Sequence, residues 1–304
     1  MGVSSLDESI VSRYFEYLKN RKNASKNTLS SYKRDLDKYF DYLKSIDVCD
    51  VTVVDSTTVS DYISSITEHG NSSSTALRNL ASVRSFYKFL EENRYIDSNP
   101  ARDIEVVKYE KRPPQGLTKL QVALLLEMPV CNNIKGYRDK ALLELMYATG
   151  MRVTDLINLK MSDINLNVGY MYRRQNGKES ILPIYSIARE SVRNYVEKRK
   201  SIPNSKDSDV LFLNLNGSPL TRQGVWKIVK YYQKKTGLKI DITPHSIRHS
   251  FAIHMLENGA DLKSVQELMG HSDISSTQVY QQVIKNKLSD VYEKSHPRAK
   301  TKEK

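Results

Sequence analysis

A chain of 304 residues is long for one compact core, so two domains are expected. Hydrophobic residues make up 39% of the sequence and no apolar run approaches the roughly 18 residues of a membrane span, so no membrane helix is expected. The N-terminus has neither the basic start nor the apolar centre of a signal peptide, and Cys49 and Cys131 have no metal or redox spacing. These features predict a protein of the reducing cytoplasm.

The net charge of +12 favours nucleic acid or an anionic surface as a partner. Residues 1–112 contain 17 basic and 17 acidic residues, so residues 113–304 carry the whole excess of positive charge. The second part of the chain is therefore the basic domain.

Four helices are predicted in the first part, because its apolar residues recur at helical spacing. The first three are marked by Ile10, Tyr14, Tyr17 and Leu18, by Leu29, Tyr32, Leu36, Phe40 and Leu43, and by Val59, Tyr62, Ile63 and Ile66. The fourth, residues 74–90, has one apolar stripe, and we expect Arg78, Ser82 and Ser85 on the opposite arc.

Two stretches of the first part, residues 17–34 and 69–90, contain no acidic residue, while they hold six and three basic residues. Both are rich in Ser, Thr and Asn, which donate hydrogen bonds to phosphate oxygens as Lys and Arg do. A solvated helix face is the alternative interpretation. We favour DNA binding, with these candidate contacts: Lys26, Lys33, Arg34, Arg78, Arg84 and Lys88.

A charged stretch followed by Pro113, Pro114 and Gly116 predicts an extended, semi-rigid linker. We therefore expect an N-terminal helical domain at residues 1–106, a linker at 107–116 and a second domain at 117–304.

Within the second part, residues 136–148 predict an apolar helix that ends at Gly150, and residues 154–159 predict the next helix. Arg152 falls at their junction, where a charge between two apolar helices needs a partner. Asp155, three residues further on, is the candidate for orienting it.

Strands are predicted at residues 168–175 and 178–184, around a type I′ turn at Asn176 and Gly177 that puts Lys178 at the hairpin tip. An exposed surface lysine is the ordinary interpretation of that position. Helices are expected at residues 187–200, 221–236 and 285–294.

Residues 243–280 concentrate the candidate site. Thr243 can cap a helix whose first residue is Pro244, which puts His245 and Arg248 in the first turn, where an anion is favoured. A helix at residues 261–269 should end at Gly270 and leave His271 at a corner, and a short helix starting at Ser275 or Ser276 would carry Tyr280. His245 and His249 also have the i, i+4 spacing of a zinc site, although Ser246 breaks the H-E-x-x-H pattern.

If Arg152, Lys178, His245, Arg248, His271 and Tyr280 converge, they could break and rejoin a phosphodiester without a metal. Two guanidinium groups can bind the non-bridging oxygens and stabilise the charge added at a five-coordinate phosphorus. A tyrosine hydroxyl, with a pKa of about 10, needs an imidazole to take its proton, and His245 is our candidate. Lys178 could protonate the departing sugar oxygen. The bond to Tyr280 would conserve energy, so that religation needs no ATP.

At these residues the sequence resembles the tyrosine recombinase (phage integrase) family, most closely the bacterial Xer recombinases of the XerC and XerD type. The segments NTLSSYKRDLDKYFDYL and LRNLASVRSFYKFL resemble its core-binding domain. The segments ATGMRVTDLINL, PHSIRHSFAIHMLENGADLKSVQELMGHSDISSTQVY and SHPRAK resemble its catalytic domain.

The resemblance implies a mainly α fold, with a four-helix SAM-like domain and a mostly helical catalytic domain that holds a three-stranded antiparallel sheet. It implies no cofactor and assigns these roles: Tyr280 as nucleophile, Arg152 and Arg248 as the arginine pair, His245 and His271 as the histidine pair, Lys178 as the hairpin lysine and Asp155 as the supporting acid. It further implies a clamp on a double-stranded recombination site and a homo- or hetero-tetramer joined by C-terminal helices at about 285–304. A DNA translocase is a candidate activator, and the sequence leaves open whether one is required.

The sequence departs from the family pattern at Gln281 and Gln282 after the tyrosine, and at Ser180 in the hairpin. Because Ser180 weakens the assignment of Lys178, Arg173 and Arg174 are kept as alternative phosphate contacts. Chromosome dimer resolution is the expected role. A recombinase of a phage or mobile element, a DNA-binding regulator without catalysis and a zinc enzyme are the alternatives.

Overall fold

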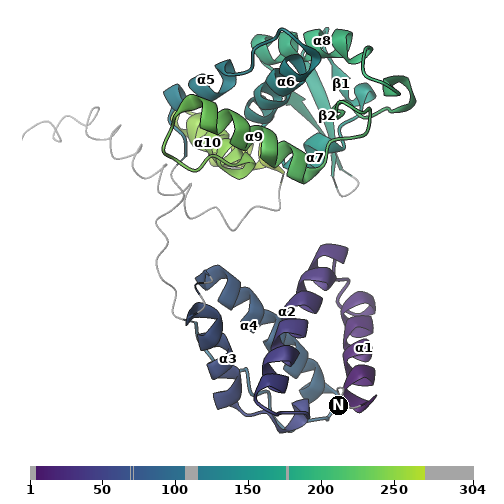
Figure 1. The fold of residues 1–304 in the computed structure, drawn as a ribbon, viewed down its shortest axis with the longest axis vertical. Coiled ribbons are helices and arrows are strands. Elements are labelled where there is room, and N and C mark those ends of the chain that lie inside the picture. Colours follow the sequence, from purple (N-terminus) through teal and green to yellow (C-terminus); the bar gives the residue numbers. More distant parts are fainter. Residues whose placement is uncertain (1–4, 69, 71, 107–115, 176–177, 271–304) are drawn as a thin grey trace, which may run out of the picture. The chain divides into compact units, whose positions relative to one another are not determined.

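In the computed structural model the chain divides into two compact units, Met1–Lys111 and Arg112–Lys304 (Figure 1). The structure describes residues 5–68, 70, 72–106, 116–175 and 178–270. The turn at residues 176–177, most of the expected linker and everything after Gly270 lie outside the described residues. None of the described helices is both long and apolar enough to cross a membrane.

The first unit contains the four predicted helices, which are confirmed as α1 (Ser5–Asn20), α2 (Lys26–Ser45), α3 (Ser56–Glu68) and α4 (Ser73–Glu92), with a 3-10 turn at Val51–Val53. Two of them begin where a serine caps the first turn, because the Ser25 and Ser72 hydroxyls accept from the backbone N–H groups of Thr28 and Thr75. The core is built around fully buried Tyr14, Leu36, Tyr39, Val83, Phe86 and Tyr87. These apolar contacts hold α2 and α4 side by side.

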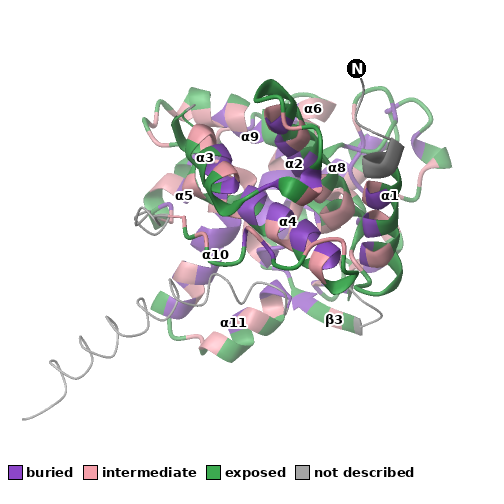
Figure 2. Cartoon of the chain, turned by 90° about the horizontal axis from the view of Figure 1, so that it is seen from below, coloured by how far each residue is buried: buried purple, intermediate pink, exposed green. Residues whose placement is uncertain are grey.

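Helix α4 is buried along much of its length (Figure 2). The predicted arc opposite its apolar stripe includes Ser82, which is fully buried, so the separation of that arc from the core is wrong for Ser82. Its hydroxyl donates to the Asp35 carboxylate of α2 at 3.1 Å, while Ser85 accepts from the hydroxyl of Tyr14 in α1 at 2.9 Å. Helix α4 packs against α1 through Tyr14 and Phe86 and also against α2 and α3. A helix covered on several sides buries hydroxyls that find a partner, whereas Arg78 stays largely exposed.

The second unit is mostly helical around a small sheet, as predicted. Its helices are α5 (Lys119–Glu127), α6 (Ile134–Thr149), α7 (Val153–Ile157), α8 (Ser186–Arg199), α9 (Arg222–Thr236), α10 (Pro244–Glu257) and α11 (Leu262–Met269), with 3-10 turns at Met161–Asp163 and Ser205–Asp207. Strands β1 (Ile164–Asn165), β2 (Tyr170–Gln175) and β3 (Lys178–Pro183) form an antiparallel sheet in the order β1-β2-β3. The β2–β3 register runs from Tyr170 opposite Pro183 to Gln175 opposite Lys178.

Helix α6 is the central helix of this unit and packs against α5, α8 and α10. Its buried Arg138 donates to Asp139 at 2.7 Å, and Asp139 also accepts from the Tyr232 hydroxyl at 3.0 Å. The buried charges are therefore paired, as a core helix requires. The end of α6 is thus held in a fixed position, and the residues after it begin the candidate site.

Gly150 ends α6 in the left-handed conformation, with φ 56°. A Cβ built there would lie 2.3 Å from Cδ1 of Phe251 in α10, whereas one at Gly237, the left-handed cap of α9 with φ 69°, would meet nothing within 4 Å. Gly237→Ala is expected to cost about 1–2 kcal/mol of unfolding free energy from backbone strain alone. Gly150→Ala should cost about 1–3 kcal/mol more, because Phe251 must move.

Thermal unfolding of the two variants measures this difference. A larger loss of Tm for Gly150→Ala is the expected outcome. Equal losses of Tm would mean that Phe251 can move aside without loss of stability. The close approach of Gly150 to Phe251 would then not help to fix the end of α6.

Candidate active site

The first part of the site is the junction between α6 and α7. Arg152 is the N-cap residue of α7 and has an extended backbone, with φ −70° and ψ 148°. Arg152 therefore lies at the junction of α6 and α7, two residues after Gly150, as the sequence predicted. The Arg152 side chain is half-buried, and Asp155 lies in the first turn of α7.

The second part of the site is the first turn of α10. Thr243 and Ser246 form a reciprocal capping box and Pro244 occupies the first helical position, so the predicted start of this helix is confirmed. His245 is exposed, whereas only 4% of Arg248 is accessible. The two residues share a turn, yet one faces solvent and the other faces the interior.

Arg248 joins three segments that are distant in sequence. Its Nη1 donates to the backbone oxygen of Gly150 at 2.5 Å, and its Nη2 donates to that of Met269 at 2.9 Å. The guanidinium thereby connects α10 to the end of α6 and to the end of α11. Arg152 lies two residues after Gly150, whose backbone oxygen is bound by Arg248.

A third arginine, Arg173 of β2, is buried beside them. Its Nη1 donates to the Leu268 oxygen at 2.5 Å and its Nη2 donates to the Glu267 oxygen at 2.9 Å. The last carbonyl groups of a helix lack partners within the helix and carry partial negative charge. Arg173 and Arg248 together satisfy three of them and hold the last turn of α11.

The charges of this cluster act on one another. Burial lowers the pKa of the Arg173 guanidinium below its usual value, the neighbouring Asp155 carboxylate raises it, and Arg248 and Arg152 lower it. Asp155 Oδ2 is buried and accepts no hydrogen bond from the described part of the chain. Asp155 is predicted to orient Arg152, and its carboxylate raises the pKa of Arg173. The site therefore contains three arginines and one acid. We call these four residues the arginine cluster.

The other candidates are only partly described. Lys178 begins β3 opposite Gln175, but its side chain lies outside the description. His271 and Tyr280 also lie outside the described residues, together with the expected C-terminal helix. Gly270, with φ 84°, ends α11 as the predicted C-cap.

The two histidines of the zinc alternative differ in environment, since His245 is exposed and His249 is buried. Within the described ranges, no group of three or more His, Cys, Asp or Glu side chains is placed to hold a metal ion. The zinc alternative therefore gains no geometric support from this part of the chain.

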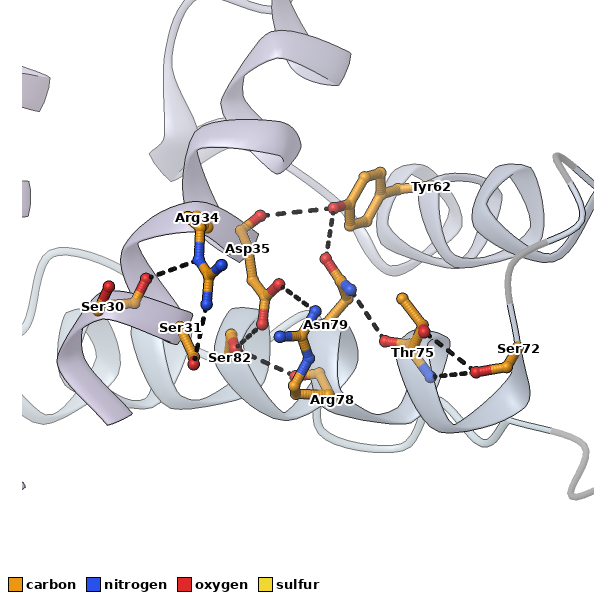
Figure 3. A network of polar contacts seen from close by, with 10 residues as sticks. All are labelled: Ser30, Ser31, Arg34, Asp35, Tyr62, Ser72, Thr75, Arg78, Asn79 and Ser82. Carbon is orange, nitrogen blue, oxygen red and sulfur yellow. Dashed lines mark hydrogen bonds and ion pairs between the residues drawn. The ribbon is translucent and has the colours of Figure 1, made fainter. Parts of the chain in front are cut away.

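The two acid-free stretches of the first unit lie together, because α2 packs against α4. Figure 3 shows Ser30, Ser31 and Arg34 of α2 on one side of Asp35, with Arg78 and, further along α4, Thr75 on the other. The remaining candidates there are exposed Lys26, the Lys33–Asp37 pair at 3.2 Å and the Lys88–Glu92 pair at 3.8 Å.

Two of the arginine candidates for DNA contact donate to backbone oxygens. Arg84 donates to the oxygens of Ala101 and Ile104 at 2.8 and 2.6 Å, and Arg173 holds α11 as described above. Arg174 is exposed and pairs with Glu179 at 2.6 Å and with Asp163 at 3.1 Å. Arg84 and Arg173 therefore have a structural role, and their contact with DNA stays a prediction.

Sequence reasoning predicted α9 but overlooked its surface. The helix contains five basic residues and no acidic residue, and its exposed side carries Trp226 and Tyr231. Lys230 lies 5.5 Å from the Trp226 ring centroid, and Lys235 lies 5.0 Å from that of Tyr231. The same acid-free pattern that marked the first unit would have identified this basic, aromatic surface.

Comparison with known proteins covers both units. The model of the phage integrase family matches residues 115–287, and the model of the phage integrase N-terminal SAM-like domain matches residues 11–93. Tyrosine recombinase XerD of Staphylococcus haemolyticus is 41% identical over 294 residues, which is 96% of this chain and 100% of that protein. Tyrosine recombinase XerD of Staphylococcus aureus is 40% identical with the same coverage.

Solved structures share the fold. XerH site-specific recombinase bound to its palindromic difH substrate aligns with a TM-score of 0.76 at 23% identity, over 93% of this chain and 84% of that one. A lambda integrase dimer bound to a COC′ core site aligns with a TM-score of 0.72 at 20% identity, over 91% of this chain and 94% of that one. Because a family model covers more than half of its length and relatives match it almost from end to end, the chain belongs to the phage integrase family of tyrosine recombinases.

Proposed function

We propose that this protein is a site-specific DNA recombinase that cuts and rejoins strands through a 3′-phosphotyrosyl intermediate. The convergence of Arg152, Arg173, Arg248 and Asp155 at the ends of α6 and α11 is the observation that carries the proposal. Such a concentration of guanidinium groups suits a phosphodiester, whose non-bridging oxygens accept paired N–H bonds.

Within the cluster, Arg152 and Arg248 would bind the scissile phosphate and stabilise the charge that develops when phosphorus becomes five-coordinate. Arg173 would keep α11 in place, so that the chain after Gly270 begins from a fixed point. His245 stands at the N-terminus of a 14-residue helix, where free N–H groups favour an anion. The first turn of α10 thus presents both a guanidinium and an imidazole to the phosphate.

The chemical step assigned to Tyr280 exchanges one phosphoester bond for another. Its hydroxyl oxygen forms a bond to phosphorus and gives its proton to a histidine, while the bond from phosphorus to the 5′ oxygen breaks. Lys178 would protonate that departing oxygen. Attack by a 5′ hydroxyl of the partner strand reverses the sequence and releases Tyr280, so exchange needs no ATP and passes through a Holliday junction.

Duplex DNA would be held by the basic surface of α2 and α4 and by the basic surface of α9, since Lys and Arg side chains neutralise phosphates. We propose that four subunits, identical or of two kinds, assemble on two sites by docking helices at about 285–304. The likeness to XerD proteins supports chromosome dimer resolution as the role. We further propose that the protein acts on the nucleoid and is activated by a DNA translocase. Service to a phage or mobile element would use the same chemistry.

The proposal is tested by incubating the purified chain with nicked duplexes that carry candidate recombination sites of its host, in the presence of a chelator. We expect a covalent adduct on a denaturing gel, mapped by peptide analysis to Tyr280. Tight binding of a duplex without any adduct, across all candidate sites and with a second recombinase added, would favour the DNA-binding regulator. Adduct formation that stops in chelator and returns with zinc would favour the metalloenzyme.

A further inference from the structure

A buried carboxylate lies beneath an exposed guanidinium where α2 meets α4 (Figure 3). Asp35 Oδ1 lies 2.8 Å from Arg78 Nη2, and the side chains are 1% and 44% exposed respectively. This contact is an ion pair that lacks the alignment of a hydrogen bond. The other oxygen, Oδ2, accepts from the buried Ser82 hydroxyl at 3.1 Å. Both oxygens of Asp35 are thus engaged on the α4 side.

Buried polar contacts surround this pair. The Tyr62 hydroxyl of α3 donates to Asn79 Oδ1 at 3.0 Å, and Asn79 Nδ2 donates to the Thr75 oxygen at 2.9 Å. Asn79 and Tyr62 are both buried, so these groups are satisfied within the first unit. A buried carboxylate that loses its counter-charge is costly, so Arg78 is held against Asp35. The guanidinium therefore stays beside Asp35 at the surface.

The surface around Arg78 is the acid-free one. The first turns of α2 and α4 contain no acidic residue, and exposed Arg34 and Lys26 lie on α2. Asp35 is the first acidic residue after the stretch 17–34, and it is turned inward. Arg78 thus differs from Lys33 and Lys88, whose acidic partners are exposed, because its carboxylate partner is buried beneath it while part of its planar fork remains exposed.

We infer that Arg78 reads a base edge in the recombination site and that Asp35 is the positioning residue that aims it. A neutralised guanidinium gains little from a phosphate, whose attraction is mainly one of net charge. A planar fork held beside a buried carboxylate instead suits two hydrogen bonds to O6 and N7 of a guanine in the major groove. The inference rests on the proposed DNA binding by the first unit and goes beyond it, because it assigns sequence preference to one residue pair.

The test uses the full-length chain and a library of duplexes randomised in sequence, sequenced before and after selection by binding. We expect the wild-type protein to select a guanine that Arg78→Ala and Arg78→Lys both fail to select, with a loss of about 5- to 150-fold in preference at that position. Lysine keeps the charge above Asp35 but cannot form the fork. A purely structural role for Arg78 predicts that lysine restores the preference.

Asp35→Asn keeps the shape and the Ser82 contact but removes the counter-charge. We expect the guanine preference to fall. The affinity for a single duplex of arbitrary sequence should stay the same or rise, and the slope of its salt dependence should increase by up to about one released counterion. Asp37→Asn is the matched control, because it removes the same charge from the exposed Lys33–Asp37 pair on the same helix. It should leave the preference intact.

The inference is also overturned if Arg78→Ala weakens all sequences equally and lowers the salt slope by about one, as a phosphate contact would. It fails as well if Arg78→Ala leaves the selected sequences unchanged, or if Asp35→Asn keeps the preference that Arg78→Ala loses. A wild-type chain that selects no sequence would overturn the proposed function as well. All assays run below the unfolding transition of each variant, so that lost stability cannot imitate lost preference.

Discussion

Replacing Tyr280 by Phe is expected to abolish covalent attachment to DNA and to leave DNA binding unchanged. The substitution keeps the aromatic ring and removes the oxygen that would attack phosphorus, so no phosphotyrosyl bond can form. Loss of a nucleophile costs on the order of 10⁴-fold or more in rate. The adduct on a denaturing gel and the affinity of the uncut duplex measure the two effects separately.

Tyr172→Phe is the matched control, because Tyr172 is a partly buried tyrosine of β2 that directly precedes Arg173 in the chain. It should form the adduct as the wild type does. An adduct that survives Tyr280→Phe but disappears in Tyr172→Phe would move the nucleophile to the strand and would refute the assignment of Tyr280.

The sequence predicted those parts of the site that local rules decide. Thr243, Pro244 and Ser246 lie within four consecutive residues and determine where α10 begins, so the burial of Arg248 in its first turn follows from one helix start. Gly150 likewise ends α6 through its own backbone freedom. In both places the signal and the structure that it causes are neighbours in the chain.

The parts that escaped prediction depend on segments far apart in the sequence. Arg173 reaches the carbonyl groups of α11 across more than ninety residues, and Ser82 meets Asp35 across 47. Spacing along one helix says nothing about such partners, which is why Ser82 was predicted on the arc opposite the apolar stripe and the contact of Arg173 with α11 was not predicted. The basic surface of α9 was not predicted for another reason, because the excess of basic residues was assigned to residues 113–304 as a whole.

Arg248→Lys is expected to reduce adduct formation by about 10³- to 10⁵-fold, the range found when an arginine that stabilises a phosphoryl transition state is lost. Lysine has one ammonium group, which cannot reach both the Gly150 and Met269 oxygens and also fork onto a phosphate. One buried carbonyl would lose its partner, at a cost of about 1–3 kcal/mol in unfolding free energy. The rate of adduct formation and the denaturant midpoint measure the two losses.

Arg173→Lys separates the chemical role from the structural one. Arg173 also donates two bonds to the end of α11, through the Glu267 and Leu268 oxygens, so its replacement should destabilise the unit by a similar amount. Since Arg173 is proposed to hold the helix and not the phosphate, its loss should slow adduct formation much less than that of Arg248. If Arg173→Lys and Arg248→Lys lose the same rate of adduct formation and the same stability, Arg248 acts only by fixing α11. Of the arginine pair, Arg152 alone would then bind the phosphate.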